Sequence, residues 1–301
     1  MLVLQALYTL SDEQAEYQVR DRLSFMRLAG LARHDAVPDA KTIWLCREQL
    51  TRAGALARLF ACLDPMLAER SNLLTGGQIV DATLVEARRR CATAARQRVG
   101  RRRARDRSTA TGAGPSSAAA RRRRPRARST RPRPRSRCRC SAGPKVTGGH
   151  KNHLGIDRAH GFISRFTVTH AARHHGSQLG AVLDPNNTAS GVRVGDRRLA
   201  EGHTAYRTKP NLDALERRGL VPEFRRAKPR GRSMPAHIAR GNATRARVRS
   251  LVKHVFAAEK RRMGLVVRSI GPVRATARIT LANLAYNMRR PVWIEGRGAL
   301  A

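Results

Sequence analysis

The stretch that decides the fold is Gly77-Gln78-Ile79-Val80-Asp81-Ala82-Thr83, an apolar run that leads into an aspartate. Before it, apolar residues recur at the spacing of helices. Within it the hydrophobic period changes, and the apolar pair followed by the β-branched Thr83 is typical of a strand. We therefore predict that residues 76–87 hold the first strand of a sheet and that Asp81 lies on it.

The segment before this strand, residues 1–75, is predicted to form a small helical domain. Ser11 and Gln14 are three residues apart, which is the spacing of a capping box at the start of a helix. Val19 and Met26 then belong to an apolar series at helical spacing. A small helical bundle is the expected product.

The segment after residue 147 changes from strand-like to helix-like patterns. Apolar and β-branched runs predict strands over 153–157, 163–168 and 192–194. Helical spacing predicts helices over 178–183, 245–262 and 275–289. Mixed strands followed by helices indicate an α/β or α+β domain, which we assign to residues 148–295 together with the first strand.

Residues 88–147 interrupt this pattern. From 88 to 145 the chain holds 21 arginines, one lysine and a single acid, Asp106, so about half of the net charge of +40 lies there. The segment has hardly any large apolar residue and cannot offset its ordering entropy by burial, so we expect disorder. Two interpretations stay open: a tail that binds phosphates, or an out-of-frame translation of GC-rich DNA, which the abrupt composition change favours.

The charge of the whole chain points to a polyanionic partner. A net charge of +40 and a pI near 11.9 favour nucleic acid, while an aromatic content of 4% argues against binding of single strands by stacking. The cysteines are scattered and odd in number, which suits a reducing cytosol. No apolar run has the length of a membrane span. We therefore expect a cytoplasmic, nucleoid-associated protein without a membrane segment.

Two aspartates are candidate ligands of a hard metal ion. Asp81 belongs to the first predicted strand, and Asp196 stands at the tip of the predicted strand 192–194. A lone aspartate at a strand end more often caps a turn, so neither residue is informative by itself. Several histidines also lack cysteine or carboxylate partners at ligand spacing, and we expect them to face solvent or DNA. They are His150, His153, His170, His174 and His175.

A series of short motifs resembles bacterial insertion-sequence transposases of the DDE class, in the branch with a small helical N-terminal domain. The resemblance covers residues 1–87 and 148–295, and it rests on the order and number of the motifs. They are Leu10-Ser-Asp-Glu-Gln14, Asp21-Arg-Leu-Ser-Phe25, Val37-Pro-Asp-Ala-Lys-Thr-Ile-Trp44, Gly77-Gln-Ile-Val-Asp-Ala-Thr83, Gly149-His-Lys-Asn-His153, Leu183-Asp-Pro-Asn-Asn187, Val248-Arg-Ser-Leu-Val-Lys-His-Val-Phe256, Arg262-Met-Gly264 and Leu281-Ala-Asn-Leu-Ala-Tyr-Asn-Met-Arg-Arg290.

The resemblance implies a ribonuclease H-like fold, in which a mixed five-stranded sheet carries helices on both sides. In this fold the first aspartate lies on the first strand, the second just after the fourth strand, and a glutamate on a later helix. Asp81 and Asp196 take the aspartate positions, whereas Lys253 stands at the position of the glutamate. Arg249 and Lys260 match two basic positions of the same helix, which the family is expected to use for contacts with DNA phosphates.

The chemistry that the resemblance implies needs all three carboxylates. In-line attack on a phosphodiester uses two Mg²⁺ ions, and Mg²⁺ takes oxygen ligands in octahedral geometry. Asp81 and Asp196 are able to share one ion, but the ammonium group of Lys253 repels the second. Glu259, six residues further on, is rotated by about 240° around the helix and should face elsewhere. We therefore expect a degenerate copy that does not cleave DNA.

The expected partner is double-stranded DNA, in the form of the terminal inverted repeats of the element, bound by a homodimer. Two alternatives stay open beside an inactivated transposase. One is a nucleic-acid-binding protein without catalysis that retains the helical domain and the basic surface. The other is a translated pseudogene relic that does not fold through its middle.

Overall fold

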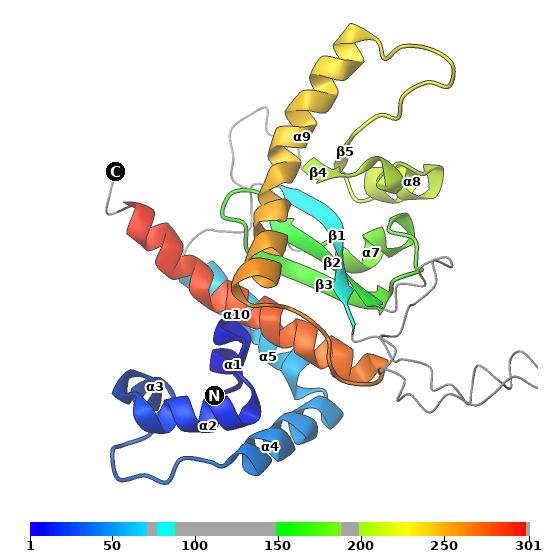
Figure 1. Ribbon diagram of the computed structural model, residues 1–301. Coiled ribbons are helices and arrows are strands. Elements are labelled where there is room, and N and C mark those ends of the chain that lie inside the picture. Colours follow the sequence, from blue (N-terminus) through cyan, green and yellow to red (C-terminus); the bar gives the residue numbers. More distant parts are fainter. Residues whose placement is uncertain (71–76, 88–148, 186, 188–198, 299–301) are drawn as a thin grey trace, which may run out of the picture. The chain divides into compact units, whose positions relative to one another are not determined.

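The computed structural model describes residues 1–70, 77–87, 149–185, 187 and 199–298 (Figure 1). These residues all belong to one unit, formed by the parts of the chain on either side of residues 89–146. The Arg-rich segment 88–147 lies outside the described residues, so its disorder and its two interpretations stay predictions. Within the described part, no helix combines the length and apolarity of a membrane span.

The described residues contain a five-stranded mixed sheet with the strand order β3-β2-β1-β4-β5. The strands are β1 (Gln78–Glu86), β2 (Gly149–Asp157), β3 (Ile163–His170), β4 (Leu199–Gly202) and β5 (Val221–Phe224). β1 pairs antiparallel with β2, which pairs antiparallel with β3. On its other side β1 pairs parallel with β4, and β4 pairs parallel with β5. The strand that carries Asp81 is therefore the central one.

Helices cover both faces of the sheet (Figure 1). They are α7 (Leu179–Val182), α8 (Lys209–Glu216), α9 (Ala236–Ala257) and α10 (Pro272–Gly298). Successive side chains of a strand point to opposite faces, so Ile79 packs with the apolar side chains of α9 and α10, while Val80 packs with those of α7 and α8. The predicted mixed α/β fold with helices on both sides of the sheet is confirmed.

Gly155 on β2 lets α7 approach the sheet closely. A Cβ atom at this position would overlap the backbone carbonyl oxygen of Val182, the last residue of α7. The pairing of β2 with β3 also shifts between Gly155 and Ile156, and such an irregularity bends a strand locally. A residue without a side chain is therefore required here for packing between the sheet and the helix.

The helices before the sheet are α1 (Leu2–Tyr8), α2 (Asp12–Asp21), α3 (Leu23–Leu28), α4 (Ala40–Arg52) and α5 (Ala55–Arg70). The predicted capping box is confirmed at the start of α2, where the Ser11 hydroxyl accepts from the Gln14 amide at 3.2 Å and the Gln14 side chain accepts from the Ser11 amide at 3.0 Å. Leu56 and Phe60 of α5 belong to the main core of the sheet. The N-terminal helices therefore share that core.

Hydrogen bonds between side chains join three of these helices. Arg47 of α4 donates to both carboxylate oxygens of Asp12 on α2 at 2.7 Å. The buried Gln5 of α1 donates to Asp12 at 2.7 Å and accepts from Arg47 at 3.3 Å. The guanidinium group lowers the pKa of the Asp12 carboxyl although partial burial opposes this. Charge-assisted bonds of this kind fix the relative positions of the helices.

Candidate functional site

The candidate site is centred on Asp81, in the middle of β1. The alternation along the strand turns its side chain to the same face as Ile79, toward α9. Only 7% of the residue is exposed to solvent. A carboxylate with so little access to water needs partners, because an unpaired charge is costly to bury.

Arg249 of α9 supplies the main partner. Its Nε and Nη2 atoms lie 2.9 Å and 2.8 Å from the same oxygen of Asp81, Oδ2. The other oxygen, Oδ1, accepts a hydrogen bond from the backbone amide of Ala82 at 3.0 Å. Both carboxylate oxygens are therefore engaged by donors of the chain. Arg249, which we predicted to contact DNA, has its guanidinium group on Asp81 in this structure.

A histidine directly follows the neighbouring strand β4. The parallel register places Val80 beside Gly202, the last residue of β4, so that His203 follows at the level of Asp81. The strand that we predicted over 192–194, with Asp196 at its tip, precedes β4 in the chain and is not among the described residues. Asp196 itself lies outside the described residues, and its role as a ligand stays a prediction.

The charge of Asp81 contributes to the pKa values of three polar side chains, which are His175, His203 and Tyr206. Burial lowers the pKa of His175 and of His203, although the negative charge of Asp81 opposes the shift in both. Burial also raises the pKa of the Tyr206 hydroxyl, with a further contribution from Asp81. At neutral pH these groups are uncharged, and the Asp81–Arg249 pair is the charged centre of the site.

Some buried polar atoms of this region have no hydrogen-bond partner within the described residues. They include the hydroxyl of Tyr206 and the Nδ1 atom of His175. Buried polar groups are normally satisfied, in many cases by ordered water. The site therefore has buried polar atoms near the ion pair that bind no group in the described part of the chain.

Lys253 lies one helical turn after Arg249, on the same side of α9. Both Lys253 and Lys260, which belongs to the π-helical turn η3 (Ala258–Arg262), are exposed. Arg249, Lys253 and Lys260 thus bring three cations to the helix that faces Asp81. Lys253 thus places an ammonium group at the position where the resemblance led us to expect a glutamate.

Glu259 lies in the same π-helical turn but belongs to the core. It has no exposed surface, and its two oxygens accept from the amide of Asn152 on β2 at 3.3 Å and 3.4 Å. Burial raises the pKa of this carboxyl to about 8. Its contact with Asn152 agrees with the prediction that Glu259 faces elsewhere.

One of the histidines of β2 and β3 differs from expectation. His153 is completely buried, with its Nε2 atom 2.8 Å from the hydroxyl of Thr169. Burial lowers its pKa to about 4. The expectation that this residue faces solvent or DNA is therefore wrong, because it points to the sheet face that packs on α7. The rings of His150 and His170 face each other across the two strands, with their centroids 6.1 Å apart.

The described residues do not fit the two-metal site that the resemblance implies. Among them, no group of three or more histidine, cysteine, aspartate or glutamate side chains is placed to hold a metal ion. Asp81 contributes one carboxylate, and that carboxylate already binds a guanidinium group. Mg²⁺ requires several oxygen ligands, and the groups beside Asp81 are cations, imidazoles and a phenol.

Sequence reasoning missed His203 and Tyr206. A strand of four residues is too short to show a period, so β4 gave no pattern that would have placed its end beside Asp81. The only local signal is Gly202, a residue that commonly marks the end of a regular element. The long-range pairing of β1 with β4 is what brings these residues to the site.

Comparison with known proteins adds one match. Residues 1–49 match the family described as Transposase domain (DUF772). The matched segment runs from α1 into α4 and includes Gln5, Asp12 and Arg47, which form the hydrogen-bond network described above. No solved structure matches the chain. The match of the N-terminal helices supports a transposase family for this chain.

Proposed function

We propose that this chain is a DDE-type transposase by descent, which binds double-stranded DNA and whose cleavage site is incomplete. The order β3-β2-β1-β4-β5, with one antiparallel half and one parallel half, supports a ribonuclease H-like assignment. Asp81 on the central strand has the position expected of the first catalytic aspartate. The match of residues 1–49 to a transposase domain supports the same descent.

The observation that carries the proposal of inactivity is the Asp81–Arg249 ion pair. Mg²⁺ would have to displace a guanidinium group that lies 2.8 Å and 2.9 Å from the carboxylate. Lys253, one helical turn after Arg249 on the same side of α9, adds a second cation that disfavours a divalent ion there. His203 at the end of β4 supplies no charge to compensate. The site therefore favours the ion pair over a metal ion.

DNA is the partner that the charge of the chain supports. The net charge of +40 favours a polyanion, and contacts of lysine and arginine with phosphates make such binding depend strongly on salt. By family resemblance the specific ligand is the terminal inverted repeat of the element, bound by a homodimer. Exposed cations, such as Lys253 on α9 and Lys260 in the π-helical turn, are available for the DNA backbone.

The full chain tests both parts of the proposal. Fluorescence anisotropy with a labelled 30-base-pair duplex should give binding that weakens steeply between 50 and 200 mM salt. Incubation with supercoiled plasmid and Mg²⁺ should give no nicked product. Nicking that requires Mg²⁺ and disappears in Asp81→Asn would refute the proposed inactivity and support a working metal site.

A second variant separates an inactivated enzyme from a protein that never used this chemistry. Lys253→Glu restores the carboxylate that the family has at this position. Nicking by Lys253→Glu, absent in the parent chain, supports descent from an active enzyme with the site placed as proposed. Nicking that persists in Asp81→Ala refutes the assignment of Asp81.

A further inference from the structure

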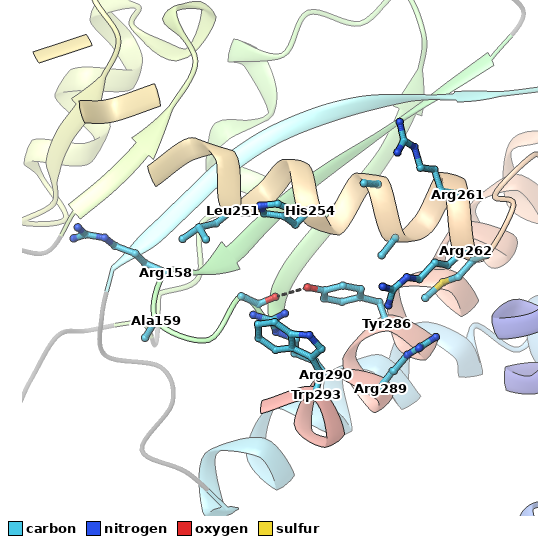
Figure 2. A pocket seen from close by; sticks show the side chains of 14 residues that line it. Arg158, Ala159, Leu251, His254, Arg261, Arg262, Tyr286, Arg289, Arg290 and Trp293 are labelled. Atoms are coloured by element: carbon cyan, nitrogen blue, oxygen red, sulfur yellow. Dashed lines mark hydrogen bonds between the residues drawn. The ribbon is translucent and has the colours of Figure 1, made fainter. Parts of the chain in front are cut away.

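A pocket of about 610 Å³ lies on α9 between the π-helical turn, α10 and the turn that connects β2 with β3 (Figure 2). Its lining includes five arginines, and among the described residues that line it there is no acidic side chain. The arginines are Arg158, Arg261, Arg262, Arg289 and Arg290. Three separate segments of the chain thus bring positive charge to one concave surface.

The walls of the pocket are tied to one another by hydrogen bonds. The Tyr286 hydroxyl of α10 donates to the carbonyl of Gly161 at 3.1 Å, and Arg290 donates through Nε to the carbonyl of His160 at 2.6 Å. Asn287 accepts from the Ile163 amide at 2.9 Å and donates to the Ile163 carbonyl at 2.7 Å. The β2–β3 turn is therefore fixed on α10, and the pocket is formed in advance.

Gly161 contributes to this arrangement by its lack of a side chain. Its φ angle of +72° lies in the left-handed region, and a Cβ atom would approach Nη2 of Arg290 to 3.2 Å. Arg290 in turn places its guanidinium carbon 4.0 Å from the centroid of the Trp293 ring. Figure 2 shows these two side chains close together beneath α9, next to Tyr286.

Three of the pocket arginines have no carboxylate partner in the described part of the chain. Arg261, Arg262 and Arg289 are exposed, and within the described part no carboxylate lies within 4.0 Å of their guanidinium groups. Guanidinium groups present planar pairs of donors that match the oxygens of a phosphate. A concave, rigid surface with several such groups attracts an anion from solution.

The pocket is separate from the Asp81 site although both involve α9. Residues of an α-helix are rotated by about 100° per position. Leu251 and His254, which line the pocket, therefore lie about 200° and about 140° around the helix from Arg249. The helix presents one side to Asp81 and another to the pocket, so the two can be changed independently.

We propose that this pocket binds the phosphate backbone of DNA, with Arg261 and Arg289 as the principal contacts. This inference rests on the proposed DNA-binding function and adds a specific location to it. Inorganic phosphate offers the same oxygen atoms, so it serves as the small anion against which DNA is compared. The hydrogen-bonded walls fix the backbone that carries Arg289 before the ligand arrives, which lowers the ordering cost of binding.

Trp293 provides a direct optical reporter. The chain contains two tryptophans, Trp44 and Trp293, and Trp44 is 49% exposed on α4. In a Trp44→Phe variant of the full chain, emission comes from Trp293 at the pocket alone. Titration with a 30-base-pair duplex should change this emission in a saturable way, and the change should be lost when Arg261→Ala and Arg289→Ala are combined.

Salt dependence gives a second, quantitative readout. Each phosphate contact contributes a slope of about −0.9 to the logarithm of the binding constant against the logarithm of salt concentration. The double variant should therefore lower the magnitude of the slope by about 1.8. The matched control is Arg207→Ala with Arg218→Ala, which removes two exposed arginines before and after α8, on the other side of the sheet. The slope of this control variant should equal that of the parent chain.

The outcomes separate the two proposals. Absence of duplex binding by the parent chain in anisotropy refutes the proposed function itself. Duplex binding without a Trp293 response, or with equal slopes in the pocket and control variants, refutes the pocket and leaves the function standing. A Trp293 response to millimolar inorganic phosphate but not to duplex also overturns the proposal, because the ligand would then be a small anion. Thermal unfolding of both double variants at the parent temperature excludes an effect on the fold.

Discussion

Replacement of Arg249 by alanine should destabilise the fold, because it leaves the carboxylate of Asp81 buried without its counter-ion. At about 2.9 Å and an effective dielectric of about 20, the attraction between the two charges is about 6 kcal/mol before desolvation. The side chains are 16% and 9% exposed, so desolvation cancels much of this attraction. We expect the free energy of unfolding to fall by about 2–3 kcal/mol.

Urea unfolding followed by circular dichroism measures this change, and a double-mutant cycle isolates the pair. Asp81→Ala, Arg249→Ala and their combination should show a coupling energy of about 1–3 kcal/mol. The control is Arg247→Ala, an exposed residue two positions before Arg249 on α9 and outside this pair, which should leave stability within about 0.5 kcal/mol. A coupling energy near zero would refute the ion pair as the centre of the site.

Three further perturbations test other parts of the structure. Since burial raises the pKa of Glu259 from its usual 4.5 to about 8, the folded state holds this proton more tightly than the unfolded state. Stability should therefore fall by about 1 kcal/mol per pH unit between about pH 5 and pH 8, and Glu259→Gln should flatten this dependence in urea titrations. Gly155→Ala should lower the free energy of unfolding by about 2–4 kcal/mol, because the added Cβ meets the carbonyl of Val182. An unchanged melting temperature would contradict the close packing of α7. Asn287→Ala removes both hydrogen bonds to Ile163 and should lower the free energy of unfolding by about 2–3 kcal/mol. A decrease below about 0.5 kcal/mol would show that other contacts hold the β2–β3 turn.

The parts of the fold that could be predicted from the sequence are those with long, regular patterns. The strand over Gln78–Glu86, the following strands β2 and β3, and the helices α9 and α10 have enough residues to show their period. The capping box of Ser11 and Gln14 is a local interaction, so its residues and spacing were sufficient to predict it.

The parts that could not be predicted depend on pairing between distant segments. β4 and β5 have four residues each, and their place in the sheet is set by contacts with β1 and with each other. The ion pair joins Asp81 with a residue 168 positions away, and nothing in either local sequence indicates that the two meet. The position of His203 after β4 follows from the same pairing.

The burial of certain polar residues could not be predicted from the sequence either. Asn152, His153 and Glu259 are polar by composition and completely buried in the structure. The side-chain amide of Asn152 on β2 donates hydrogen bonds to the carboxyl group of Glu259 in the π-helical turn. A period of apolar residues identifies the core face of an element, but it cannot identify polar residues that are satisfied inside the core.

The most direct test of the account is a calorimetric titration of Mg²⁺ into the full chain at neutral pH. If a guanidinium group holds the Asp81 carboxylate and Lys253 stands where a third carboxylate belongs, no saturable heat is expected at millimolar Mg²⁺. Saturable binding that is lost in Asp81→Asn would contradict the account, because it would mean that a metal ion displaces Arg249 and that the site is complete.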